Sequence, residues 1–363
     1  MADPNTQVSP IISLPLLNST PPHLAPKFEQ TYVEYYNKFS AGRLATHQVP
    51  IESYRANPAK YTTSYGRALY PSTGLRITTQ TCPVSSPPGS IKIQIFEPEN
   101  KAEEGKRPVY VNFHGGGWVF GGLPTDFDFC KRIANETGAV AFDVDYRLAP
   151  EEGFPTQVVD CWEALNWIHK EKAEEFNLDL NKVAIGGCSA GGHLSAVLAH
   201  LCRDSKLPLK FQLLSVPVCD LSMFAEDGSL KLDQPYASYN EFAECPPLPA
   251  ERMSYFFKHF LQDLRFPDKA GKFGEGGEEE WKVSPIKAKS WKGLADALVI
   301  TAECDVLRDE GEAYAKKLEE GGNRVEVKRV KGAPHIFMQL DGILEGGREY
   351  NRVVVGALRE AFK

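Results

Sequence analysis

Short apolar, β-branched runs alternate with longer helical patterns from about residue 77 to the end of the chain, and this alternation limits the possible folds more than any other feature. Several runs are continuously apolar, as strands buried on both faces of a sheet should be. Alternating strands and helices predict a mostly parallel sheet with helices on both faces and right-handed crossovers. The predicted strands are 77–83, 91–96, 109–113, 140–145, 183–186, 211–216, 298–302 and 325–330.

Five helical patterns accompany these runs, so the sequence predicts an α/β fold built on a mostly parallel eight-stranded sheet. The first two strands are joined by the short turn Pro87-Pro88-Gly89 and are therefore predicted to pair as an antiparallel hairpin. The predicted helices lie near residues 126–137, 157–175, 190–203, 309–321 and 345–362.

Two aromatic-rich stretches fall outside the alternation. In the first, aromatic residues at roughly helical spacing predict one or two amphipathic helices. These residues are Tyr32, Tyr35, Tyr36 and Phe39. The second stretch ends in a Gly- and Glu-rich loop at 269–280, which is predicted to be mobile. The predicted division is an N-terminal cap segment (1–75), a core (76–219 and 291–363) and a cap insertion (220–290).

The sharpest motif is Gly187-Cys188-Ser189-Ala190-Gly191, which lies between a predicted strand and a predicted helix. This is the setting of a nucleophile elbow, in which glycines permit a tight, strained turn that lifts the serine hydroxyl above the sheet. The helix N-terminus that follows favours negative charge developing near the serine. Ser189 is therefore the predicted nucleophile.

A second motif, His114-Gly115-Gly116-Gly117, follows the predicted strand 109–113 directly. Consecutive glycines expose backbone N–H groups without side chains in the way, which suits an oxyanion hole completed by the N–H of Ala190. A flexible glycine turn is the alternative. His114 itself is predicted to hold this loop by hydrogen bonds rather than to act as a base.

A nucleophilic serine needs a base, and the base needs a carboxylate to orient it. His335 comes late in the chain after a strand, in the position that the order nucleophile–acid–histidine requires. Asp305 directly follows another strand and is the predicted acid, with Glu303, Asp309 and Glu310 as rivals. Asp309 and Glu310 are expected to open the next helix instead.

The remaining histidines after Ser189 fit other roles better. His259 lies within the aromatic insertion, whereas His193 and His200 lie on the helix after the elbow and are expected to pack or face solvent.

The eight scattered cysteines form no C-x-x-C pair and no cluster with zinc-ligand spacing. Several lie in apolar segments and are predicted to be buried, reduced thiols, which is typical of a reducing compartment. The chain opens on Met1-Ala2-Asp3-Pro4, which is acidic where a signal peptide would be basic, so we expect a cytoplasmic protein.

Composition also restricts the partners. A net charge of −7 gives no support to nucleic-acid or anionic-membrane binding. No apolar run approaches the ~18 residues that would span a bilayer, so stable membrane insertion is not expected.

Together these motifs resemble the hormone-sensitive lipase family of α/β-hydrolases, over about residues 90–340. The most specific element is the segment Asp145-Tyr146-Arg147-Leu148-Ala149-Pro150-Glu151. The other segments that carry the resemblance are 114–117, 187–192 and 304–311. The resemblance implies the α/β-hydrolase fold, with a cap made of an N-terminal helical segment and an insertion after the sixth strand.

The resemblance also implies roles for individual residues. Ser189 would be the nucleophile, Asp305 the acid and His335 the general base. The oxyanion donors would be Gly116, Gly117 and Ala190, with Gly115 shaping the loop. No metal or organic cofactor is implied, and the family often forms homodimers through its final strand and helix.

Two positions depart from the family pattern. Cys188 stands where the family usually has Asp, which removes a charge behind the elbow. We expect its thiol to point away from the substrate, so that Ser189 remains the nucleophile. Pro334 before His335 is also unusual and restricts the backbone there.

The predicted function is hydrolysis of short-to-medium acyl or aryl esters of small molecules through an acyl-enzyme, because an aromatic cap implies a mostly apolar pocket. Amide or lactone cleavage by the same triad is an alternative. A non-catalytic receptor of the same fold is another, but such receptors lack the catalytic histidine, whereas His335 is present. Triglyceride lipase activity is less expected, because nothing indicates a surface-seeking amphipathic helix.

Overall fold

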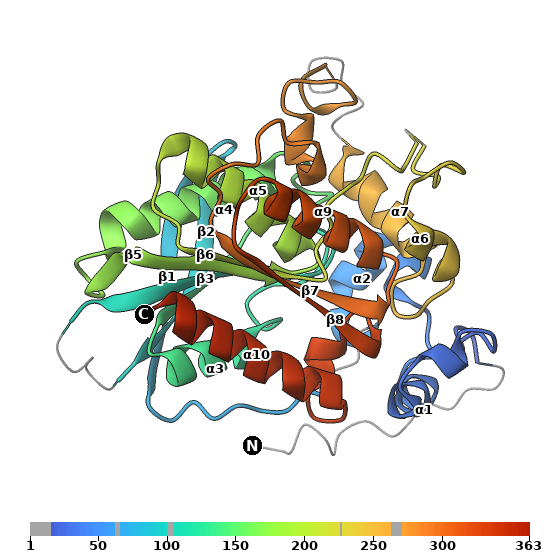
Figure 1. The fold of residues 1–363 in the computed structure, drawn as a ribbon. Coiled ribbons are helices and arrows are strands. Elements are labelled where there is room, and N and C mark those ends of the chain that lie inside the picture. Colours follow the sequence, from blue (N-terminus) through green and yellow to red (C-terminus); the bar gives the residue numbers. More distant parts are fainter. Residues whose placement is uncertain (1–15, 62–65, 100–104, 226, 263–270) are drawn as a thin grey trace.

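The strands of the computed structural model form one sheet, in the order β1-β2-β4-β3-β5-β6-β7-β8 (Figure 1). The structure describes residues 16–61, 66–99, 105–225, 227–262 and 271–363, and eight strands lie within these ranges. β2 pairs antiparallel with β1, as predicted, and also with β4, while the other neighbours are parallel, as expected of a mostly parallel sheet. The strands are β1 (Leu75–Ser85), β2 (Pro88–Pro98), β3 (Arg107–Phe113), β4 (Val140–Asp145), β5 (Leu178–Cys188), β6 (Phe211–Ser215), β7 (Asp296–Cys304) and β8 (Val325–Pro334).

The hairpin turn between β1 and β2 is shorter than the sequence prediction. Ser85 pairs with Pro88, so that Ser86 and Pro87 form the turn while Pro88 and Gly89 belong to the ladder. Pro88 is tolerated there because it is the first residue of its strand, where a missing N–H costs least.

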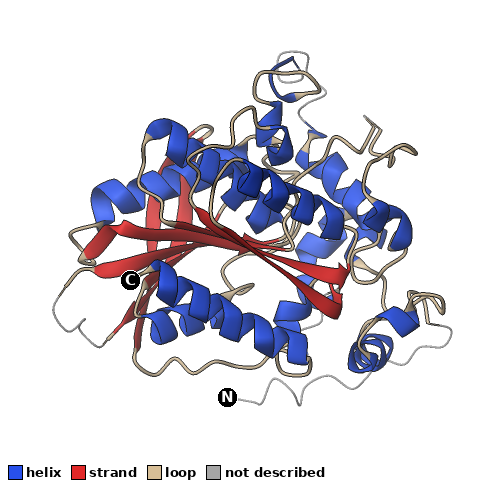
Figure 2. Ribbon diagram, viewed as in Figure 1, coloured by secondary structure: helices blue, strands red, loops and turns tan. Residues whose placement is uncertain are grey.

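Helices cover both faces of the sheet, which explains why its central strands are buried on both sides (Figure 2). α3 and α10 lie on one face, and α4, α5 and α9 lie on the other (Figure 1). A π-helical turn, Ile168–Lys172, extends α4 over most of the predicted helix at 157–175. These helices are α3 (Phe127–Thr137), α4 (Thr156–Trp167), α5 (Ala190–Ser205), α9 (Arg308–Glu320) and α10 (Glu345–Ala361).

The N-terminal segment and the insertion after β6 gather at the end of the sheet where the parallel strands finish (Figure 1). The two stretches touch, because the Tyr32 hydroxyl donates to the Pro246 carbonyl at 2.9 Å. The longer elements here are α1 (Gln30–Phe39), α2 (Ile51–Ala56), α6 (Ala237–Glu241) and α7 (Ala250–Phe260). The 3₁₀ turns of the fold are η1 (Ala25–Lys27), η2 (Thr46–Gln48), η3 (Pro58–Lys60), η6 (Glu280–Lys282), η7 (Pro285–Lys287) and η8 (Phe337–Leu340).

The N-terminal segment also reaches the loops that follow the last two strands. The Glu29 N–H donates to the Gly332 carbonyl at 2.9 Å, and the Cys304 thiol donates to the Lys27 carbonyl at 3.2 Å. These bonds place the start of α1 beside the carboxyl ends of β7 and β8.

The acidic loop predicted at 269–280 lies partly outside the described residues. From residue 271 onward its backbone is tied down, since the Glu279 N–H donates to the Lys272 carbonyl. Its mobility stays a prediction.

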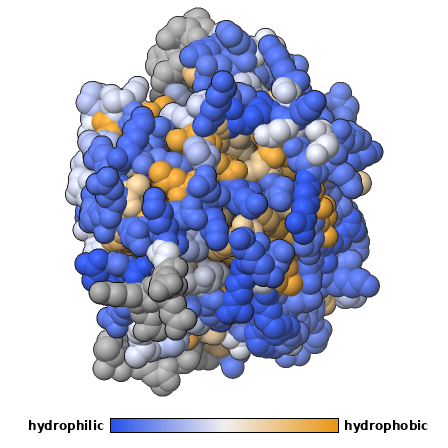
Figure 3. Space-filling view, turned by 60° about the vertical axis from the view of Figure 1, so that its left-hand side comes forward, coloured by the Kyte–Doolittle hydropathy of each residue, from blue (hydrophilic) through white to orange (hydrophobic). Residues whose placement is uncertain are grey.

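All eight cysteines are buried as free thiols, which agrees with the prediction that they fill apolar segments. Hydrophilic residues cover most of the face in Figure 3, with apolar residues showing in a limited central region. Among the described residues, no helix has the length and apolar character needed to cross a membrane.

Candidate active site

Ser189 lies in a sharp turn between the last residue of β5 and the first residue of α5. Its backbone has φ 58° and ψ −115°, a conformation that costs energy for any residue with a Cβ. The Ser189 N–H donates to the Ser215 carbonyl at 2.8 Å, which fixes the turn against β6. The predicted elbow is therefore present, and its serine is 8% exposed.

Glycine is required on both sides of this turn. A Cβ added to Gly187 or to Gly191 would lie closer than 3.0 Å to the Phe113 carbonyl oxygen at the end of β3. Backbone cannot yield as a flexible side chain could, so both positions exclude any larger residue. This close approach is the physical reason for the glycines of the motif.

Asp305 and His335 meet at the carboxyl ends of β7 and β8. The His335 Nδ1–H donates to Asp305 Oδ2 at 2.7 Å, and Asp305 Oδ1 accepts the Leu307 N–H at 3.1 Å. Asp305 is 1% exposed and His335 is 4% exposed, so little water competes for this pair. The carboxylate therefore fixes both the orientation and the tautomer of the ring.

Parallel pairing of β5, β6, β7 and β8 brings Ser189 to the same edge of the sheet as this pair. Within the described part of the chain, neither the Ser189 hydroxyl nor His335 Nε2 forms a hydrogen bond. Catalytic hydrogen bonds of this kind are often long until a substrate tightens them.

The rival acids bond elsewhere. Glu303 accepts the Gly332 N–H at 2.7 Å, and Asp309 accepts the Ser238 N–H at 2.7 Å. Glu310 is fully buried and accepts the Cys219 N–H at 2.6 Å, and burial raises the pKa of its carboxyl well above the usual value. Sequence reasoning placed Glu310 in the first turn of a helix, which is correct, but missed that it holds the chain just after β6.

The glycine loop after β3 lies against the elbow. A Cβ on Gly115 would approach the Cys188 carbonyl to 2.9 Å, and Gly116 and Gly117 adopt φ values of 123° and 61°. Among the described residues, the N–H groups of Gly116 and Gly117 donate no hydrogen bond. Ala190 opens α5, so its N–H also lacks a helical partner. Among the described residues, three backbone donors in the elbow and in the loop that lies against it therefore form no hydrogen bond.

His114 stabilises this loop, as the sequence predicted. Its ring stacks on Tyr146 with centroids 4.2 Å apart, and its Nδ1 lies 2.8 Å from the Gly115 carbonyl. The Tyr146 hydroxyl donates to the His114 carbonyl at 2.8 Å. Burial lowers the pKa of His114, so the ring is held neutral.

An aromatic cluster joins the insertion to the glycine loop. Trp118 stacks on Phe260 of α7 with centroids 4.0 Å apart, and its indole N–H donates to His193 Nδ1 at 3.2 Å. Phe256 lies so close to Gly117 that an added Cβ would overlap its ring. The sequence showed an aromatic insertion and left His193 either packed or facing solvent, and the structure shows it packed. No pattern shows which aromatic residue reaches which glycine.

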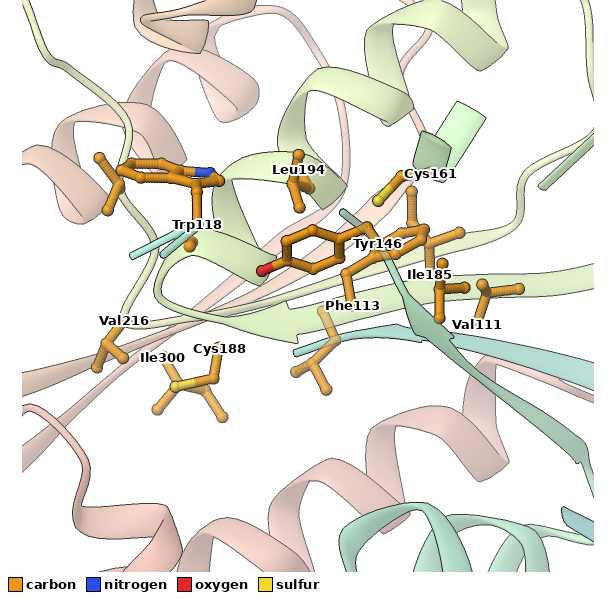
Figure 4. Close-up of a cluster of buried hydrophobic side chains, with 14 of the residues drawn as sticks. Val111, Phe113, Trp118, Tyr146, Cys161, Ile185, Cys188, Leu194, Val216 and Ile300 are labelled. Carbon is orange, nitrogen blue, oxygen red and sulfur yellow. The ribbon is translucent and has the colours of Figure 1, made fainter. Parts of the chain in front are cut away.

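Cys188 points away from this site, as predicted. Its side chain lies on the opposite side of β5 from Trp118 and Leu194 (Figure 4), with its sulfur 3.7 Å from Met338 Sδ. It lines a cavity of about 40 Å³ together with Asp126 and Tyr350. Burial raises the pKa of the Cys188 thiol well above the usual value, so it is not a thiolate nucleophile.

Comparison with known proteins agrees with the fold. A family model described as alpha/beta hydrolase fold matches residues 110–339. An AB hydrolase superfamily protein of Schizosaccharomyces pombe is 34% identical over 93% of this chain and 94% of its own length. An arylesterase of Saccharolobus solfataricus is 32% identical over 75% of this chain and 80% of its own. The crystal structure of a thermostable esterase from Pseudomonas putida superposes with a TM-score of 0.75 and 31% identity, covering 93% of this chain and 96% of that one.

Proposed function

The chain belongs to the α/β-hydrolase family, within the group that resembles hormone-sensitive lipase, and we propose that it is a serine carboxylesterase for short-to-medium acyl or aryl esters. The observation that carries this proposal is the 2.7 Å bond between His335 and Asp305, at the sheet edge that also bears Ser189. A receptor that had lost catalysis would have no need of an oriented base beside a strained serine.

Catalysis begins when the Ser189 hydroxyl attacks the ester carbonyl carbon. His335 Nε2 accepts the hydroxyl proton, and buried Asp305 stabilises the imidazolium that forms. The carbonyl oxygen becomes an oxyanion, which the N–H groups of Gly116, Gly117 and Ala190 are free to bind. Each such donor is worth about 3 kcal/mol of barrier.

The tetrahedral intermediate then collapses. His335 returns its proton to the departing alcohol, and the acyl group remains bonded to the Ser189 oxygen. A water molecule attacks this acyl-enzyme with His335 again as base, which releases the carboxylic acid and restores the serine. These steps require only the side chains and backbone groups described above.

The expected substrate size follows from the residues that cover the site. We propose that residues 1–75 and 220–290 act as the cap, a role supported by the packing of Phe256 and Phe260 on the glycine loop. Aromatic side chains so close to the oxyanion donors suit compact acyl or aryl groups better than long chains.

We also propose a cytoplasmic location and a homodimer. The location is supported by eight free cysteines, since disulfides persist in oxidising compartments. The dimer is supported by the edge position of β8, which offers an unpaired strand.

The test is hydrolysis of p-nitrophenyl esters from acetate to palmitate by the wild type and by Ser189→Ala. We expect activity to peak at short or medium chains and to be abolished by the substitution. Ser205→Ala, an exposed serine at the end of α5, is the matched control and should behave as the wild type. Activity that survives in Ser189→Ala, or no turnover of any ester, would sink the esterase proposal.

A further inference from the structure

Arg252 of α7 is a cation without a carboxylate partner among the described residues. Its Nη1 donates to the Pro247 carbonyl at 2.9 Å, and its guanidinium lies 5.5 Å from the centroid of the Phe256 ring. Its buried Nε has no hydrogen-bond partner, and its Nη2 forms no hydrogen bond to any described residue. Nε–H and Nη2–H project in parallel from one edge of a guanidinium, the arrangement that binds both oxygens of a carboxylate.

Other unsatisfied polar atoms lie on α7 and on the turn η2 that contacts it. Among the residues that the structure describes, the buried Tyr255 hydroxyl on α7 has no hydrogen-bond partner, and neither do Thr46 Oγ1 and His47 Nδ1 on η2. Burial lowers the pKa of His47 to about 4, so this ring is neutral and Arg252 supplies the charge. Buried polar atoms normally have partners, and several orphans around one cation indicate a group that binds there.

The location is suitable for part of a substrate. Arg252 lies one helical turn, about 6 Å along the axis, from Phe256. The Phe256 ring in turn covers Gly117 of the glycine loop. Tyr36 and Tyr54 of the N-terminal segment are also close to Arg252, because its charge opposes the rise in their pKa that burial causes. Arg252 therefore lies where the two segments of the proposed cap meet.

We infer that Arg252, with the Tyr255 hydroxyl, binds a carboxylate carried by the substrate, so that the preferred substrates are half-esters of dicarboxylic acids. This inference rests on the proposed esterase function and adds the chemical class of the substrate. The ester carbonyl would lie at Ser189 and the free carboxylate at Arg252, with an apolar linker past Phe256.

The test compares p-nitrophenyl hydrogen adipate with its neutral isostere, methyl p-nitrophenyl adipate. Shorter half-esters are avoided, because their own carboxylate attacks the aryl ester efficiently. In the wild type we expect kcat/KM to be about 10- to 100-fold higher for the anionic ester, mainly through KM. Arg252→Gln should remove this ratio, Tyr255→Phe should reduce it, and Arg252→Lys should retain part of it.

Arg352→Gln, at an exposed position on α10, removes an equal charge elsewhere and should leave the ratio unchanged. A wild type without anionic preference, or a preference that Arg252→Gln keeps, would overturn the inference.

Binding is measured independently by titrating Ser189→Ala with monomethyl adipate and with dimethyl adipate. Selective binding of the anion, lost in the Ser189→Ala/Arg252→Gln double variant, supports the site even if no ester is hydrolysed. Equal binding of both compounds refutes it. Failure of the esterase proposal and failure of the carboxylate site are thus distinguishable.

Discussion

Replacing Gly117 by alanine should damage the glycine loop through one identified contact. The new Cβ would lie closer than 3.0 Å to three carbons of the Phe256 ring, and φ there is 61°. Left-handed backbone costs an alanine about 1–2 kcal/mol. In addition, the ring or the loop must retreat by roughly 1 Å before the contact becomes ordinary.

The loss of catalytic rate depends on whether the Phe256 ring or the glycine loop moves. A 1 Å displacement of the N–H donors from the oxyanion would cost about 100-fold in kcat. Removing the ring allows the loop to return, so Gly117→Ala/Phe256→Ala should recover at least about tenfold over Gly117→Ala. Hydrolysis of p-nitrophenyl acetate is the assay, because so small an acyl group is least sensitive to the shape of the pocket.

Gly138→Ala is the control that separates the cost of left-handed backbone from the cost of the contact with the Phe256 ring. Gly138 has φ 75°, but a Cβ there has no atom within 4 Å, and it caps α3 away from the site. It should lower the melting temperature and leave kcat intact. Gly117→Ala activity within threefold of the wild type, or no recovery in the double variant, would refute the contact as the cause.

Three further predictions concern the side chains that support this site. Asp305→Asn should lower kcat by about 10³- to 10⁴-fold with little change in KM, measured by steady-state kinetics, because the ring loses its oriented tautomer; an unchanged kcat would assign the acid elsewhere. Burial lowers the pKa of His193 to about 4 from its unfolded value of 6.5, so the unfolded chain binds more protons between these values and stability must fall as pH falls. His193 should lower the free energy of unfolding by an amount on the order of 3 kcal/mol by pH 4. This contribution should be absent from His193→Gln when urea unfolding is measured at pH 7 and at pH 4.5. Glu310→Gln should be tolerated better than Glu310→Leu, because the amide oxygen can still accept the Cys219 N–H, and loss of that acceptor should cost about 1–3 kcal/mol in denaturant unfolding. Equal stability of the two variants would contradict that role.

The centre of the sheet was predictable because its strands are buried on both faces and therefore show as continuous apolar runs. The observed β4 has the predicted bounds, 140–145, β6 ends one residue before its predicted end, and β5, β7 and β8 extend their predicted ranges. The elbow was predictable for a related reason, since Gly187 and Gly191 are dictated by local backbone approach. Features that backbone geometry dictates can be recognised in the sequence, because they restrict which residues can stand at those positions.

The surroundings of Ser189 could not be predicted in the same way. The overlap of Phe256 with Gly117, the bond from Trp118 to His193 and the isolation of Arg252 depend on how the insertion folds back over the sheet. From the sequence alone, any of the aromatic residues in 220–290 could make the contact with the glycine loop equally well. Side-chain partners across long chain separations are set by packing, which no local pattern records.

The bonds from the N-terminal segment to the ends of β7 and β8 have a consequence for how the molecule is made. Glu29 leaves the ribosome roughly 300 residues before its partner Gly332. Synthesis at about 5–20 residues per second keeps them apart for tens of seconds, and contacts of such high sequence separation form late in folding. The segment around Glu29 is thus made before the sheet and docks after it, so a nascent chain should carry an assembled central sheet before it can turn over an ester.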